Sequence, residues 1–146
     1  MTTLHPIITM LNNLTSQLPL TPEKLEEVLG IRLAPASLQN NPHFTFLEHG
    51  PCYNGLLQRV ELRLPHSTRP GLAPQLILEL VLGAKLSRQQ CLEAFGDIYE
   101  LRVPSPRQPA GSPILFCFTL SWGGLRVAIR DDAAEEAVSL LLDIHR

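Results

Sequence analysis

An α+β fold with an antiparallel sheet is predicted for this chain by three observations. Residues 20–30 and 86–96 both have the pattern of a short capped helix that ends in glycine. The segments after each of them alternate apolar and polar residues, as a half-buried strand does. The chain has 146 residues, 45% hydrophobic and 18% charged, which is typical of one globular domain. We therefore expect a single domain over 1–146.

An N-terminal helix is expected within residues 1–19. Its apolar residues recur at spacings of three and four and make one stripe, namely Ile7, Ile8, Leu11, Leu14 and Leu18. Thr2 or Thr3 would cap its start, with Pro6 in the first turn, and Pro19 would end it.

Residues 20–83 are expected to form a first helix-plus-strands unit. Thr21 is a suitable N-cap, Pro22 fits the first helical position, and Gly30 fits a left-handed C-cap. Loops rich in proline and polar residues are expected at 34–43 and 65–74. The predicted strands of this unit are Phe44–Glu48, Leu57–Leu64 and Leu76–Leu82.

Residues 84–130 are expected to form a second unit of the same kind. Ser87 would cap its helix and Gly96 would close it. A proline-rich loop is expected at 104–113, and the turn 121–124 suits a hairpin. The predicted strands are Ile98–Val103, Ile114–Leu120 and Leu125–Ile129. A C-terminal helix is expected over 131–146, capped by Asp131 or Asp132 and carrying Val138, Leu141, Leu142 and His145.

The two helical segments align without a gap as LTPEKLEEVLG and LSRQQCLEAFG. Any short capped helix that ends in glycine has some of this pattern. Together with the strands that follow, however, the repeat resembles the tandem α/β repeat of the β-lactamase-inhibitor-protein-like fold. It is also similar to small bacterial immunity proteins, which neutralise secreted toxins such as those of type VI secretion. The resemblance covers roughly residues 20–130. It implies a sheet built from two helix-plus-strands repeats, one face of which binds a protein partner. The N-terminal and C-terminal helices lie outside the repeat, and we expect them to pack on one face of the sheet.

Charge and targeting signals exclude several classes of protein. The formal net charge is −2, so there is no basic excess for binding nucleic acid. Residues 1–18 lack the basic start and the cleavage site of a signal peptide, and no apolar run is long enough to span a membrane. Cys52, Cys91 and Cys117 are too few and too widely spaced for a disulfide framework. We therefore expect a cytoplasmic protein.

No catalytic or metal-binding pattern is apparent in the sequence. His43 and His49 flank a strand, but only Glu48 and Cys52 lie near them, which is a poor ligand set for zinc. Cys52 is in a turn and has no partner base in the pattern. Phosphate-binding and nucleophile-elbow motifs do not occur. We therefore expect no enzymatic activity, no cofactor and no metal.

The polar faces of the predicted strands are the remaining candidate for a binding site. They carry Arg59, Glu61, Arg63, Glu79, Arg126 and Arg130. Such a mixed-charge face can recognise a charged partner by electrostatic complementarity. Tyr53 and Trp122 lie in turns and could anchor an interface. The alternative is an ordinary solvated sheet face with Trp122 folded inward.

Three functions remain open on the sequence. The first is an immunity protein that binds a cognate toxin or effector, as a monomer or weak dimer. The second is a small dimeric secretion chaperone for an effector, which fits the length and the terminal helices but not the near-neutral charge. The third is an enzyme or a small-molecule binder, which would need a pocket that the sequence does not indicate.

Overall fold

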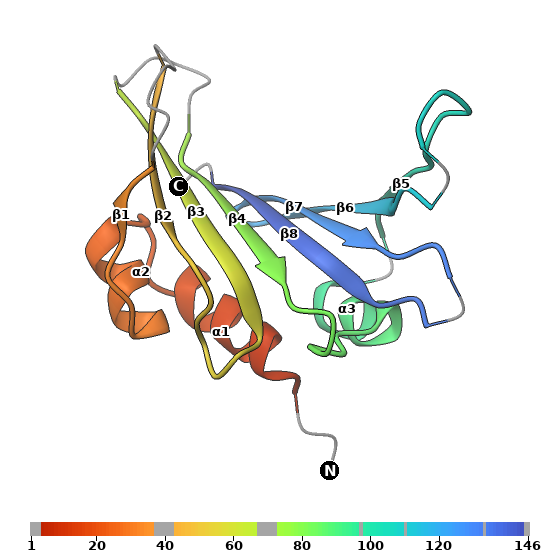
Figure 1. The fold of residues 1–146 in the computed structure, drawn as a ribbon, viewed down its shortest axis with the longest axis horizontal. Helices are drawn as coiled ribbons and strands as arrows, with labels where there is room; N and C mark the ends of the chain where they lie inside the picture. Colours follow the sequence, from red (N-terminus) through yellow and green to blue (C-terminus); the bar gives the residue numbers. More distant parts are fainter. Residues whose placement is uncertain are drawn as a thin grey trace.

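An antiparallel sheet forms the body of the protein in the computed structural model (Figure 1). The structure describes residues 4–36, 43–66, 73–96, 98–109, 111–132 and 134–144. Over these residues eight strands pair in the order β1-β2-β3-β4-β8-β7-β6-β5. The strands are β1 (Ala34–Pro35), β2 (Phe44–His49), β3 (Leu57–Pro65), β4 (Gln75–Leu80), β5 (Glu100–Arg102), β6 (Ile114–Leu120), β7 (Gly123–Ile129) and β8 (Ala137–Ile144). The helices are α1 (Pro6–Thr15), α2 (Pro22–Leu29) and α3 (Arg88–Phe95).

The helices α1, α2 and α3 lie on the same side of the sheet (Figure 1). Alternate residues of the central strands point toward them and are almost fully buried, as with Leu62 on β3 and Leu142 on β8. The apolar stripe of α1 packs into the same core. The result is an α+β fold with one packed and one open sheet face, which is the usual arrangement for an antiparallel sheet. No helix in the described ranges is long and apolar enough to cross a membrane.

The capped helices form as their sequences predict. The backbone N–H of Lys24 donates to Oγ1 of Thr21 at 3.2 Å, and Gly30 ends α2 with φ of 66°. Ser87 and Gln90 form a reciprocal capping box at the start of α3. The strands predicted at Phe44–Glu48, Leu57–Leu64, Leu76–Leu82 and Ile114–Leu120 are also present, with ends that differ by at most two residues.

The predicted C-terminal helix is wrong, because β8 occupies Ala137–Ile144 at the centre of the sheet, between β4 and β7. Val138, Leu141 and Leu142 are spaced three and four residues apart, which is also the spacing of an apolar helix face. The side chains of Leu140 and Leu142 point into the core, whereas Leu141 pairs with Ile77 on the opposite face. A strand that is apolar on both faces cannot be distinguished from a buried helix by periodicity alone. His145 lies outside the described residues.

The start of α1 also differs from the prediction. His5 is the N-cap, and the helix begins at Pro6; Thr2 and Thr3 lie outside the described residues. Nδ1 of His5 accepts the N–H of Ile7 at 3.1 Å, so Nε2 carries the proton and donates it to the carbonyl of Ala84 at 2.6 Å. The imidazole therefore ties α1 to the chain between β4 and α3. At the other end the helix stops at Thr15, before Pro19.

Candidate functional site: the open face of the sheet

The side of the sheet away from the helices is the candidate site, and we call it the open face. Strand register places one row of residues across it. From β2 to β6 the pairs in this row are Glu48 with Glu61, Glu61 with Ile77, Ile77 with Leu141, Leu141 with Arg126, and Arg126 with Cys117. Charged side chains therefore border an apolar pair at the junction of β4 and β8.

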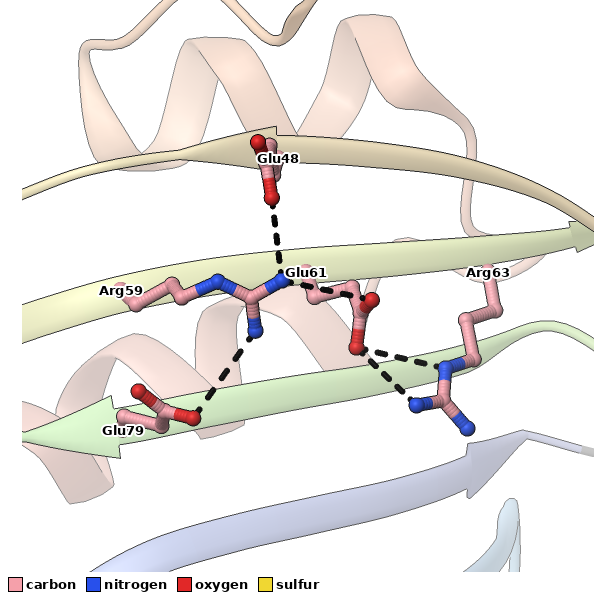
Figure 2. A network of polar contacts seen from close by, with 5 residues as sticks. All are labelled: Glu48, Arg59, Glu61, Arg63 and Glu79. Atoms are coloured by element: carbon pink, nitrogen blue, oxygen red, sulfur yellow. Dashed lines mark hydrogen bonds and ion pairs between the residues drawn. The ribbon is translucent and has the colours of Figure 1, made fainter. Parts of the chain in front are cut away.

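Arg59 is the centre of a charged network that spans three strands (Figure 2). Its Nη2 lies 3.0 Å from Oε2 of Glu48 on β2 and 3.4 Å from Oε1 of Glu61 on its own strand. Its Nη1 lies 3.8 Å from Oε1 of Glu79 on β4. One guanidinium thus contacts carboxylates from neighbouring strands on both sides, as the planar five-donor fork of arginine permits.

Glu61 is 7% exposed although helices do not cover this face. Its two oxygens are divided between two arginines, Oε1 toward Arg59 and Oε2 toward Arg63 at 3.1 Å. The guanidinium of Arg63 also lies over the ring of Phe46, 5.2 Å from the centroid. This carboxylate can be buried because opposite charges satisfy it on both sides.

The carboxylates around Arg59 stabilise its positive charge. Partial burial of Arg59 disfavours its charge, but the hydrogen bond to Glu48 and the charges of Glu61 and Glu79 outweigh this, so the pKa of Arg59 is raised above its ordinary value. Three carboxylates and two guanidiniums give the network a net charge of −1. These contacts hold the guanidinium and carboxylate groups of the network in fixed relative positions.

The apolar centre of the open face, Ile77 and Leu141, is a feature that sequence reasoning missed. Both side chains are partly exposed. In β4 the sequence reads Leu-Ile-Leu before Glu79, so the local pattern does not distinguish Ile77 from the buried residues on either side of it. Leu141 was assigned to a helix. Apolar residues on both sides of a predicted strand are the signal that could have indicated this patch.

Two shallow hollows lie at one end of the open face. The first, about 480 Å³, is lined by residues that include Arg32, Glu48 and Arg59. The second, about 410 Å³, includes Arg130 in its lining. Gln58 and Glu79 border both hollows, so the two are adjacent. The structure therefore brings Arg59, Glu61, Arg63, Glu79 and Arg126 onto one face and places Arg130 at its end.

Tyr53 and Trp122 do not join this surface. Oη of Tyr53 donates to the carbonyl of Pro6 at 3.1 Å, which fastens the β2–β3 turn to the start of α1. Trp122 is partly buried, packs against the core and borders a hollow with residues just after α1, including Leu18. These aromatics act on the helix side, where they support the fold.

Two of the three cysteines, Cys52 and Cys91, have thiols whose pKa is raised. Burial raises the pKa of Cys52, and it raises the pKa of Cys91 to about 12, so both thiols stay protonated at neutral pH. Within the described part of the chain, no three His, Cys, Asp or Glu side chains gather where they could hold a metal ion.

Comparisons with known proteins give no relative for this chain: no family model, curated protein or solved structure matches it.

Proposed function

We propose that this chain is a protein-binding inhibitor of the immunity type, which binds a cognate toxin or effector through the open face of its sheet. The observation that carries the proposal is the apolar pair Ile77 and Leu141, bordered by the Arg59 network on one side and by Arg126 on the other. An apolar centre with a charged rim is the usual organisation of a protein interface.

The geometry supports binding rather than catalysis. Arg59 and Arg63 are already held by carboxylates, so an arriving partner would have little side-chain entropy to remove. Fixed charges of both signs favour a partner with the complementary pattern and speed its association. The partner's active site would then be covered by the bound sheet, with no reaction needed on this chain.

The order of elements supports the resemblance to tandem-repeat inhibitors. One half of the sheet follows α2 and the other follows α3, and their last strands, β4 and β8, meet at the centre. The paired strands read QLILEL and SLLLDI, and their register is symmetric about Ile77 and Leu141. A duplicated unit would produce this symmetry.

Co-expression tests the proposal. The protein encoded beside this chain's gene is expressed in bacteria with and without the chain, and growth and complex formation on gel filtration are recorded. We expect the chain to restore growth and to elute with its neighbour. An unrescued culture in which no complex forms would contradict the proposal.

A matched pair of variants locates the surface. Arg126→Glu reverses an exposed charge on β7, and Lys85→Glu makes the same change in the connection between β4 and α3. We expect Arg126→Glu to weaken the complex and Lys85→Glu to leave it intact. If both variants bind as the wild type does, the interface lies elsewhere.

The alternative function, a small secretion chaperone, is favoured by exposed apolar side chains near β5, since a dimeric protein needs a surface for its second copy. The partner's own activity separates the two functions. An inhibitor abolishes that activity in the complex, whereas a chaperone leaves it intact and increases secretion of the partner.

A further inference from the structure

We propose that two copies of this chain form a two-fold symmetric dimer by pairing their β5 strands edge to edge. This interaction is separate from the open face, and it does not depend on which of the two functions considered above is correct. It would join the two sheets into one continuous sheet.

Exposed apolar side chains gather at this edge. Among the described residues the large exposed hydrophobic side chains are Leu4, Leu82, Ile98, Leu101 and Val103. Three of these five fall within residues 98–103, on or beside β5, and Ile98 is 88% exposed. In the described part of the chain β5 pairs with β6 only, so its other edge is available for a further strand.

The sequence of β5 complements itself. If two copies pair in antiparallel register about Leu101, then Glu100 of each copy faces Arg102 of the other. Directly opposed residues in such a pair have their Cβ atoms about 5 Å apart, and opposite charges at that distance stabilise the pairing. In the single chain these side chains are 70% and 50% exposed, with Nε of Arg102 3.5 Å from Oε1 of Glu100.

The same register brings apolar side chains together on the helix side of the sheet. Leu101 would meet Leu101 of the second copy, and Tyr99 would meet Val103. Tyr99 already packs on the rings of Phe116 and Phe118, with centroids 5.0 and 5.7 Å away. The second copy would therefore extend an existing aromatic cluster.

The opposite edge of the sheet does not offer the same site. β1 has only two residues, and one of them is Pro35, which has no backbone N–H to donate. Self-pairing is therefore assigned to β5.

Charge reversal at β5 tests this dimer. The mass of the full chain is measured by sedimentation equilibrium over a wide concentration range. The apparent mass of the wild type should rise from 16.2 kDa, the mass of one chain, toward twice that value as the protein concentration increases. Glu100→Arg and Arg102→Glu each place like charges opposite one another. Because the symmetry applies the change twice, we expect each variant to raise the dimer Kd by roughly tenfold or more.

Mixing supplies the matched control. An equimolar mixture of the Glu100→Arg and Arg102→Glu proteins places opposite charges at both positions, so it should form a heterodimer. The double variant carrying both changes should regain the homodimer. Thermal unfolding checks that each variant is folded. A wild type that stays monomeric at the highest concentration, or an Arg102→Glu protein that dimerises as the wild type does, would overturn the proposal. Its failure would leave the open-face test unaffected, because that test measures binding to another protein.

Discussion

Replacing Arg59 with methionine should destabilise the protein measurably, although the side chain lies on an exposed face. Arg59→Met keeps the aliphatic stem and removes the guanidinium. Three contacts are lost, at 3.0 Å to Glu48, 3.4 Å to Glu61 and 3.8 Å to Glu79. The Arg59 side chain is 35% exposed, so each ion pair is discounted toward the range of about 0.2–1 kcal/mol found for surface pairs.

Together, the loss of these three contacts should lower the free energy of unfolding by about 1–2 kcal/mol. Glu61 is the most deeply buried of the carboxylates, but it keeps Arg63 at 3.1 Å, so it is not left as an isolated buried charge. For a domain of this size the loss corresponds to a fall in Tm of about 3–6 °C. High salt should reduce the difference, because it screens the more exposed pairs first.

Urea unfolding of Arg59→Met beside Arg126→Met gives the comparison. Arg126 lies on the same face and makes no ion pair among the described residues, so its substitution should cost less than about 0.5 kcal/mol. Equal effects of the two substitutions would refute the reasoning, because they would show that the Arg59 network adds nothing to stability.

Three further outcomes follow from the structure. Leu142→Ala should cost about 2–5 kcal/mol in urea unfolding, and Leu141→Ala much less, because only Leu142 is in the core; similar losses would contradict the strand assignment of β8. Tyr53→Phe should cost about 0.5–1.5 kcal/mol through loss of the bond to Pro6, and its affinity for a partner should not change. Burial raises the pKa of Cys91 from 9.0 to about 12, so the thiol ionises in the unfolded state at a lower pH than in the folded state. As pH rises between these two values, the free energy of unfolding of the wild type should therefore fall more than that of Cys91→Ala. If the free energy of unfolding of the two proteins changes with pH in the same way, Cys91 does not contribute to the loss.

Local signals predicted much of the fold. Capping residues and glycine stops identified α2 and α3, because these contacts form within a few residues of the chain. Alternation identified β3, which has one buried and one polar side. The prediction failed at β8, where neighbours distant in sequence, β4 and β7, decide the structure. Apolar residues on both sides of these strands could have indicated an apolar patch, but the pairing of Ile77 with Leu141 depends on the strand register, which the local pattern does not give.

The charged part of the site was partly predictable. Alternation placed Arg59, Glu61 and Arg63 together on one side of β3, and Glu79 followed from the next strand. That Glu61 is buried between two arginines depends on side-chain geometry, which a sequence pattern does not encode. The hydrogen bond from Oη of Tyr53 to the carbonyl of Pro6 joins residues 47 positions apart, and a turn pattern in the sequence does not encode such a contact.

Binding of the open face is tested most directly by the affinity of an Ile77→Thr variant for the protein encoded beside this chain's gene, measured by calorimetry at fixed salt. Threonine keeps the β-branched shape that suits a strand but adds a hydroxyl at the apolar centre. Leu4→Thr, which changes an apolar side chain just before α1 that is 55% exposed, is the matched control. We expect Ile77→Thr to raise Kd by roughly tenfold or more, and Leu4→Thr to leave it unchanged. Wild-type affinity in the Ile77→Thr protein would contradict the open face as the binding surface.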